Sequence, residues 1–392
     1  MIDKVKRLDC TGCSACSCIC PVKAIQMTQD EEGFQYPKIQ YDICIHCEAC
    51  ERICPALSGQ KQYAKRLERP EAKAAWTKNP ETRLMSTSGG LFTELATTFL
   101  QEGGYVAGAI YSETFQVEHF MTDDPADIAR LRQSKYVQSD KKDIFCQVRT
   151  RLKEGANVLF VGAPCEVGGL HNFLGKSYET LTTIDYICLG SNSPKIYNRF
   201  LDMLRERYQS KIVRVWFKNK EKGWNSFCTR VDFANGTHYL RNRRHDYFMR
   251  GYIGPRKYYT RPACTRCRYK GIPRQADITL ADFWGIARID PALDEDLGTS
   301  AVLLNSEKGR TLYAAARSKI HSYDMALEDI REGNGALHAS VRLADDRDAF
   351  FRDLDRMRFD KLIDRYCKKT FRQKLSDLRA DIHLYVGKKE RL

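Results

Sequence analysis

Two short stretches near the start of the chain, residues 10–21 (CTGCSACSCICP) and 44–55 (CIHCEACERICP), decide how its first part folds. Both have the spacing C-x2-C-x2-C-x3-C-P. Thiolates two residues apart wrap a tight loop around one metal centre, and the proline ends that loop so that the next turn can begin. The chain has 16 cysteines, and clustered cysteines in a sequence without export signals indicate metal ligands rather than disulfides.

The repeat matches the pattern of bacterial ferredoxins that carry two 4Fe-4S clusters, in which the fourth cysteine of each run ligates the cluster of the other run. A zinc site is disfavoured, because zinc takes four ligands in two pairs rather than two matched quartets. Two clusters form a path for single electrons, so the rest of the chain should hold the end of that path. We expect one cluster on Cys10, Cys13, Cys16 and Cys54, and the other on Cys44, Cys47, Cys50 and Cys20.

Length and composition limit the class of protein. With 392 residues the chain can form two or three domains, each with a core of its own. The first apolar stretch is interrupted by Lys4, Lys6, Arg7 and Asp9, which disfavours a signal peptide. The sequence has no apolar run of about 18 residues, so it predicts no membrane span, and we expect a cytoplasmic protein.

The pattern beyond the cysteine runs predicts an α+β ferredoxin-like two-cluster module, then an α/β domain with an antiparallel β insertion and carboxyl-terminal helices. A helix around 91–100 and strands within 105–111, 156–165 and 180–190 alternate as in α/β folds. Residues 211–240 read as antiparallel strands with a turn at Asn235 and Gly236. The expected domains are 1–57 (ferredoxin), 58–73 (linker or docking segment), 74–342 (α/β) and 343–392 (helical).

Four cysteines outside the repeat fall where ligands gather in α/β folds. Cys165 and Cys188 each follow a predicted strand, and the carboxyl ends of parallel strands line the ligand crevice. Cys264 and Cys267 form a C-x2-C pair. Together these four side chains predict a third cluster beside an active centre. The alternative is that Cys165 and Cys188 are small buried residues and that the pair binds zinc or nothing.

Several motifs in one order carry a family resemblance: TSGG (87–90), GAPCEVGGL (162–170), YICLGSNSPK (186–195), CTRCRYKG (264–271) and DITLADFWGI (277–286). Behind a two-cluster module they resemble the β-subunit family of coenzyme F420 hydrogenases and dehydrogenases, which includes 7-hydroxymethyl chlorophyll reductase. The likeness extends to about residue 360. It implies an iron-sulfur flavoprotein that binds FAD and passes electrons between clusters, flavin and a second reactant.

The resemblance also implies roles for particular residues, namely a glycine turn near the flavin at Ser88, Gly89 and Gly90, ring or phosphate contacts from Lys135 and Tyr136, close backbone approach to FAD at Gly162, Ala163 and Pro164, and a flavin-proximal cluster on Cys165, Cys188, Cys264 and Cys267. Read from the residues alone, a Ser-Gly-Gly turn before a helix offers N–H groups to a pyrophosphate, or is a plain helix start. No G-x-G-x-x-G fingerprint occurs between a strand and a helix, which disfavours an NAD site.

Residues 241–274 interleave arginines with aromatic residues, and the chain carries a formal net charge of +14. The stretch suits a phosphorylated or nucleotide-linked substrate such as a nucleotide-sugar, the pyrophosphate of FAD, or an acidic partner such as ferredoxin. A solvated basic face and single-stranded nucleic acid are the alternatives, nucleic acid being the least favoured.

We therefore expect a ferredoxin-linked, FAD-dependent reductase or dehydrogenase. His245, Asp246 and Asp282 are the candidate proton donors. The alternatives are an electron-transfer subunit that docks a catalytic partner and has no substrate of its own, and a cluster-bearing nucleic-acid protein.

Overall fold

The computed structural model describes residues 1–61, 65–254, 256–369 and 375. The chain divides into two compact units, Met1–Pro194 with Arg261–Val341, and Lys195–Thr260 with Arg342–Leu392. The predicted boundaries at 57, 73 and 342 stay predictions. Residues 62–64 of the expected linker, and the expected helical segment after Lys369 apart from Leu375, lie outside the described residues. Among the described helices none has the length and apolar character needed to cross a bilayer.

The strands of the first unit are β1 (Ile25–Gln29), β2 (Gln35–Ile39), β3 (Glu71–Thr77), β4 (Gly104–Tyr111), β5 (Val117–Thr122), β6 (Asn157–Val161), β7 (Leu181–Tyr186), β11 (Ile278–Asp282), β12 (Ser300–Leu304) and β13 (Ile320–Met325). Its helices are α1 (Ala15–Ile19), α2 (Ala49–Arg52), α3 (Pro80–Met85), α4 (Leu91–Gln101), α5 (Ile128–Leu131), α6 (Ile144–Lys153), α7 (Pro164–Leu174), α10 (Ile286–Ile289), α11 (Glu307–Ala315) and α12 (Leu327–Gly333). The two cysteine runs coincide with the short helices α1 and α2, each of which starts inside a run.

The front module pairs these two short helices with the β1–β2 hairpin. Each helix follows a residue in the left-handed conformation, Ser14 with φ 64° and Glu48 with φ 59°, which turns the chain sharply between two cysteines. The small core of the module combines buried Ile2, Ile25 and Ile39 with cysteines of both runs. The cysteine spacing therefore fixes the loops, and the hairpin supplies the apolar cover.

The main sheet of the described residues has eight strands in the order β13-β3-β12-β11-β7-β6-β4-β5. Its centre, β11-β7-β6-β4, is parallel, and the outer strands are antiparallel to their neighbours. The predicted strand and helix alternation at its centre is confirmed. The strands β3, β5 and β13 were not predicted, and β3 begins at Glu71, within the last residues of the expected linker.

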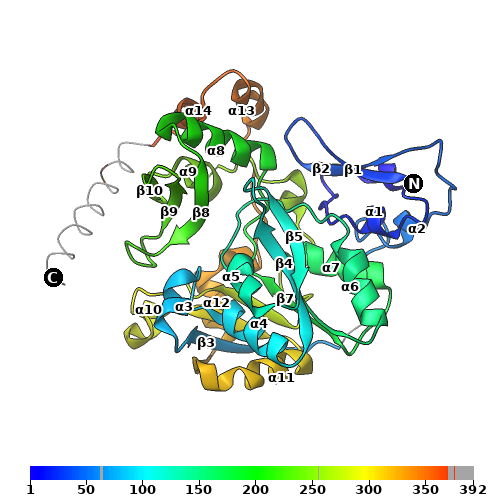
Figure 1. The fold of residues 1–392 in the computed structure, drawn as a ribbon, viewed down its shortest axis with the longest axis horizontal. Coiled ribbons are helices and arrows are strands. Elements are labelled where there is room, and N and C mark those ends of the chain that lie inside the picture. The colour runs from blue at the N-terminus through cyan, green and yellow to red at the C-terminus, as the bar shows by residue number, and fades with distance from the viewer. Residues whose placement is uncertain (62–64, 255, 370–374, 376–392) are drawn as a thin grey trace. The chain divides into compact units, whose positions relative to one another are not determined.

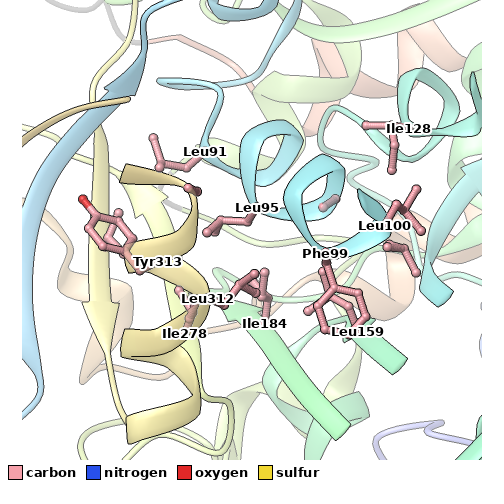
Figure 2. Packing of buried hydrophobic residues seen from close by; sticks show 14 of the residues in the cluster. Leu91, Leu95, Phe99, Leu100, Ile128, Leu159, Ile184, Ile278, Leu312 and Tyr313 are labelled. Atoms are coloured by element: carbon pink, nitrogen blue, oxygen red, sulfur yellow. The ribbon is translucent and has the colours of Figure 1, made fainter. Parts of the chain in front are cut away.

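Helices lie on both faces of the main sheet (Figure 1), and alternating side chains of the central strands pack against them. On β6, Val158 and Phe160 pack with α6 and α7, whereas Leu159 and Val161 pack with α4 and α11. This period of two with both faces apolar is what buried parallel strands require. The front module lies against α6 and α7 through α1. Figure 2 labels side chains of the α4 layer: Leu91, Leu95, Phe99, Leu100, Leu159, Ile184, Ile278 and Leu312.

The second unit contains a three-stranded antiparallel sheet in the order β10-β9-β8. The predicted β insertion is confirmed, and Gly236 takes the positive φ of 80° that the predicted turn needs. Aromatic rings of Phe200, Phe248 and Phe359 form much of the core. Its elements are β8 (Ile212–Asn219), β9 (Cys228–Phe233), β10 (His238–Asn242), α8 (Pro194–Tyr208), α9 (Tyr247–Ile253), α13 (Arg347–Leu354) and α14 (Phe359–Tyr366).

Candidate functional site

Two cavities in the front module are each lined by four cysteines, three from one run and the fourth from the other. The rest of each lining is mostly apolar, and the first cavity is also lined by Asp9, Arg268 and Tyr269. The first cavity is lined by Cys10, Cys13, Cys16 and Cys54, and the second by Cys20, Cys44, Cys47 and Cys50. The fold thus brings together the same quartets that the spacing predicts.

The thiols of the first cavity are buried close to one another. Burial, and then the neighbouring thiolates of Cys10 and Cys54, raise the pKa of Cys13 to about 11. The pKa of Cys16 is raised well above its usual value by burial first and then by neighbouring thiolates. A positively charged centre among these sulfurs would reverse the penalty, because metal ligation stabilises the thiolate. Among the described residues no three His, Cys, Asp or Glu side chains converge closely enough for one metal ion. Each cavity is instead lined by four cysteines, which is the donor set of a 4Fe-4S cubane.

Arg261 binds directly to the first cysteine loop. Its guanidinium donates to the carbonyl oxygen of Cys10 at 2.7 Å, to Cys10 Sγ at 3.5 Å and to Gln138 Oε1 at 3.0 Å. It also stacks over the ring of Tyr36 at 4.2 Å and is 1% exposed. Gly12 makes this approach possible, since a Cβ there would lie 2.9 Å from Arg261 Nη1. Arg261 therefore places a positive charge beside the sulfur of Cys10, a role that the sequence did not single out.

The third group of cysteines, Cys165, Cys188, Cys264 and Cys267, is also brought together. Cys165 lies in the first turn of α7 after β6, Cys188 follows β7, and Cys264 lies in the short 3-10 helix Pro262–Arg266. Burial, Glu166 and the thiolates of the other three cysteines raise the pKa of Cys165 well above its usual value. Burial, followed by the thiolate of Cys264, raises the pKa of Cys188 to about 12. The donor set fits a soft metal centre at the carboxyl edge of the sheet.

A buried polar network supports the start of α7 beside this group. Glu166 is paired with Lys141, and its other oxygen accepts from the N–H of Ala163 at 2.8 Å. His119 Nδ1 lies 3.0 Å from Ser139 Oγ, and burial lowers the pKa of His119 to about 4. Position 162 requires glycine, because a Cβ atom there would lie 2.8 Å from Glu166 Oε2. The sequence analysis singled out only the GAPCE segment of this network, and it did not predict the roles of Lys141, His119 and Ser139.

The Ser88–Gly89–Gly90 turn lies at the same edge of the sheet. Ser88 Oγ donates to the carbonyl of Thr299 at 2.9 Å, and the Gly89 N–H donates to Ser300 Oγ at 3.0 Å. Gly90 is the residue before α4 and has φ 89°. The turn is therefore held by β12 and starts α4 at the carboxyl edge of the parallel strands.

Arg132 is a half-buried cation near this turn. The next two residues tie it there, since Gln133 Nε2 donates to the Met85 carbonyl at 2.8 Å and the Ser134 N–H to Thr87 Oγ1 at 2.9 Å. Burial lowers the pKa of Arg132, and its Nε has no hydrogen-bond partner among the described residues. A buried guanidinium N–H without a partner fits a phosphate ligand.

Lys135 lies where its ammonium group is already occupied. Its Nζ donates to carbonyls at the end of α5, including those of Arg130 at 2.9 Å and Arg132 at 2.8 Å. Burial lowers its pKa to about 7. The predicted contact of Lys135 with flavin ring or phosphates stays a prediction, and it requires these bonds to break.

Tyr136 and Asp282 lie near Cys188. Burial, followed by the charge of Asp282, raises the pKa of Tyr136 well above its usual value, and Cys188 contributes. Asn192 donates to the Tyr136 carbonyl at 2.9 Å. Asp282 is the last residue of β11, so the edge gathers a phenol, a carboxylate and a thiol from three separate motifs.

His245 and Asp246 lie in the second unit, between β10 and α9. Asp246 is buried, accepts from the hydroxyl of Tyr239 at 2.9 Å and caps α9 through the N–H of Met249. These bonds give Asp246 a structural role. His245 lies in the second unit and Asp282 in the first. The proton-donor role predicted for each of them stays a prediction.

The aromatic residues of the basic stretch are mostly core residues. Phe248 and Tyr259 are 0% exposed, and Tyr252, Tyr258 and Tyr269 are also buried. Buried rings cannot serve as a stacking platform for bases, so the nucleic-acid alternative loses its main support.

Comparison with known families agrees with this geometry. For the beta subunit of coenzyme F420 hydrogenase/dehydrogenase, the model of the carboxyl-terminal part matches residues 155–328 and that of the amino-terminal part matches 72–142. The chain belongs to this beta-subunit family. A 4Fe-4S dicluster domain model matches residues 9–57. The predicted family and the front two-cluster module are confirmed, and with them the assignment to iron-sulfur flavoprotein oxidoreductases that transfer electrons.

One solved structure similar to this chain is a xenon derivative of the F420-reducing NiFe hydrogenase complex from Methanosarcina barkeri. The two chains share 15% sequence identity with a TM-score of 0.46, and the alignment covers 71% of this chain and 90% of that chain. A comparison with curated proteins finds no match.

Proposed function

We propose that this chain is the electron-transfer subunit of an oxidoreductase, an iron-sulfur flavoprotein that docks a catalytic partner. The observation that carries the proposal is the pair of four-cysteine cavities beside a third buried cysteine group in the same compact unit. The beta-subunit family supports this reading better than that of an enzyme with a substrate of its own. Ferredoxin or a similar one-electron carrier is the expected donor.

The front cysteines hold the two clusters in an interleaved manner. Cys54 completes the quartet of Cys10, Cys13 and Cys16, and Cys20 completes the other. The third cluster is held by Cys165, Cys188, Cys264 and Cys267 at the sheet edge. Arg261 stabilises added negative charge beside Cys10, because its guanidinium donates to that sulfur.

FAD, when bound, would link single-electron transfer to two-electron chemistry. The Ser88–Gly90 turn and the start of α4 would hold its pyrophosphate, and Arg132 would donate to it through the N–H that lacks a partner among the described residues. Gly162, Ala163 and Pro164 would let the backbone approach the cofactor closely.

The central test is an anaerobic preparation of the full chain with counts of iron, sulfide and released flavin. Two clusters give about eight irons per chain and a third raises the count to about twelve, from four irons per cubane. One FAD per chain is expected. A colourless protein that holds zinc in place of iron would refute the proposal.

The interleaved assignment is tested with paired substitutions. Cys13→Ser and Cys54→Ser should each remove about four irons, and the double variant should remove no more, because both cysteines serve one cubane. Combining Cys54→Ser with Cys47→Ser should remove about eight. If that second pair removed only about four, the fourth cysteine of each run would belong to its own run.

A reductase with a small phosphorylated or nucleotide-linked substrate is the second candidate, favoured by the buried Tyr136, whose hydroxyl lies within electrostatic reach of Asp282 and of Cys188. Dithionite-reduced protein distinguishes the two. Rapid reoxidation by the hydride acceptor coenzyme F420 or by a nucleotide-sugar would favour the reductase. Reoxidation by ferredoxin and methyl viologen alone would favour the electron-transfer subunit.

A further inference from the structure

Tyr269 is a buried tyrosine whose hydroxyl has no partner in the described part of the chain. The residue is 5% exposed, and no described group forms a hydrogen bond with its Oη. Buried hydroxyls normally find a partner, because leaving one unpaired is unfavourable. The hydroxyl can therefore donate to an acceptor outside the described residues, such as a group bound in the adjoining cavity.

The Tyr269 ring packs against the backbone of α7. A Cβ at Gly168 would lie 2.3 Å from Tyr269 Cε1 and 3.0 Å from its hydroxyl oxygen. At the next position, a Cβ at Gly169 would lie 2.9 Å from Cys13 Sγ. The Tyr269 ring thus packs against Gly168, and Cys13 of the first cavity packs against the neighbouring Gly169. Tyr269 also lines that cavity itself, with Cys10, Cys13, Cys16 and Cys54.

The same ring is close to the third cysteine group. Cys267 precedes Tyr269 by two positions, and Cys165 lies one turn before Gly168 on α7. The ring thus lines the first cavity and packs on the turn of α7 that carries Cys165.

We propose that the Tyr269 hydroxyl donates a hydrogen bond to a sulfur of the cluster in the first cavity, on the side that faces Cys165 and Cys267. Tyr269 is then a positioning residue that makes this cluster easier to reduce. Reduction adds negative charge, and a donor to a sulfur stabilises the more negative state. The inference rests on the proposed function, since it requires iron-sulfur clusters in the front module.

The test is Tyr269→Phe in the full chain, purified anaerobically, with an iron count and a redox titration followed by electron paramagnetic resonance. We expect full iron and about a tenfold less favourable reduction of one front cluster, which lowers its potential by about 59 mV for one electron. The other front cluster should keep its potential. Tyr313→Phe is the matched control: this residue is also 5% exposed, and its hydroxyl contacts Ser322 Oγ at 2.6 Å.

Unchanged potentials in a Tyr269→Phe protein with full iron would overturn the inference and leave the proposed function intact. Absence of iron from the unmodified protein would instead overturn the proposed function. If Tyr269→Phe loses iron, Gly168→Ala gives the second reading, because its methyl group displaces the ring and keeps the hydroxyl. That variant should shift the same potential downward, and an unmoved potential would also overturn the inference.

Discussion

Replacing Arg66 should destabilise the first unit strongly, because this arginine joins the segment after the cysteine runs to the main sheet. Its guanidinium lies 2.5 Å from Asp277 Oδ1, and the two side chains are 3% and 2% exposed. Burial alone would raise the pKa of Asp277, but Arg66 and hydroxyls of Ser306 and Thr183 hold it below its usual value. In Arg66→Met this carboxylate would stay buried without its cation.

Breaking a buried pair in this way costs about 3–5 kcal/mol. At about 2 °C per kcal/mol for a unit of this size, the apparent Tm should fall by about 6–10 °C. The matched control is Arg69→Met, since Arg69 pairs with Glu328 at the surface with exposures of 69% and 61%. An exposed pair contributes about 0–1 kcal/mol, so the control should lose about 2 °C at most.

Thermal unfolding of both variants at one scan rate measures the difference. Adding Asp277→Asn to Arg66→Met should recover part of the loss, because it removes the uncompensated charge. Equal shifts for the Arg66 and Arg69 variants, or no recovery in the double variant, would refute the view that the buried pair docks this segment.

Three further predictions concern single residues. Arg132→Met should weaken FAD binding about 10- to 100-fold, because it removes a charge-assisted hydrogen bond. Lys135→Met should mainly lower the free energy of unfolding. Titration of the apoprotein with flavin distinguishes the two variants. His119 keeps a pKa of about 4 when folded, so it contributes about 3 kcal/mol that is lost as pH falls from 6.5 toward 4, and His119→Gln should flatten the unfolding profile there. Burial raises the pKa of Asp246 to about 7, so its contribution is lost as pH rises from about 4 to 7; a profile that keeps its slope in Asp246→Asn would contradict this assignment.

The local features of the chain were readable from its sequence. Cysteine spacing predicts the front module, because the ligands of each loop are close neighbours in the chain. Apolar runs predict β6 and β7, and the Asn235–Gly236 turn predicts the hairpin, because these signals act over a few residues. The strands β5 and β13 escaped prediction, since these edge strands carry many polar side chains, and β3 escaped it because its sequence is rich in alanine, which has a low strand propensity.

Contacts between distant positions were decided by the tertiary structure alone. Arg66 meets Asp277 across 211 positions, and Arg261 meets Cys10 across 251. The fold also occupies the Lys135 ammonium group with backbone carbonyls, while an N–H of Arg132 has no partner among the described residues. Short-range spacing determines which residues can form a loop or strand. Which charges and hydroxyls end up beside the cysteines depends on how the sheet and α7 pack against the front module, because burial removes the water that would otherwise satisfy them.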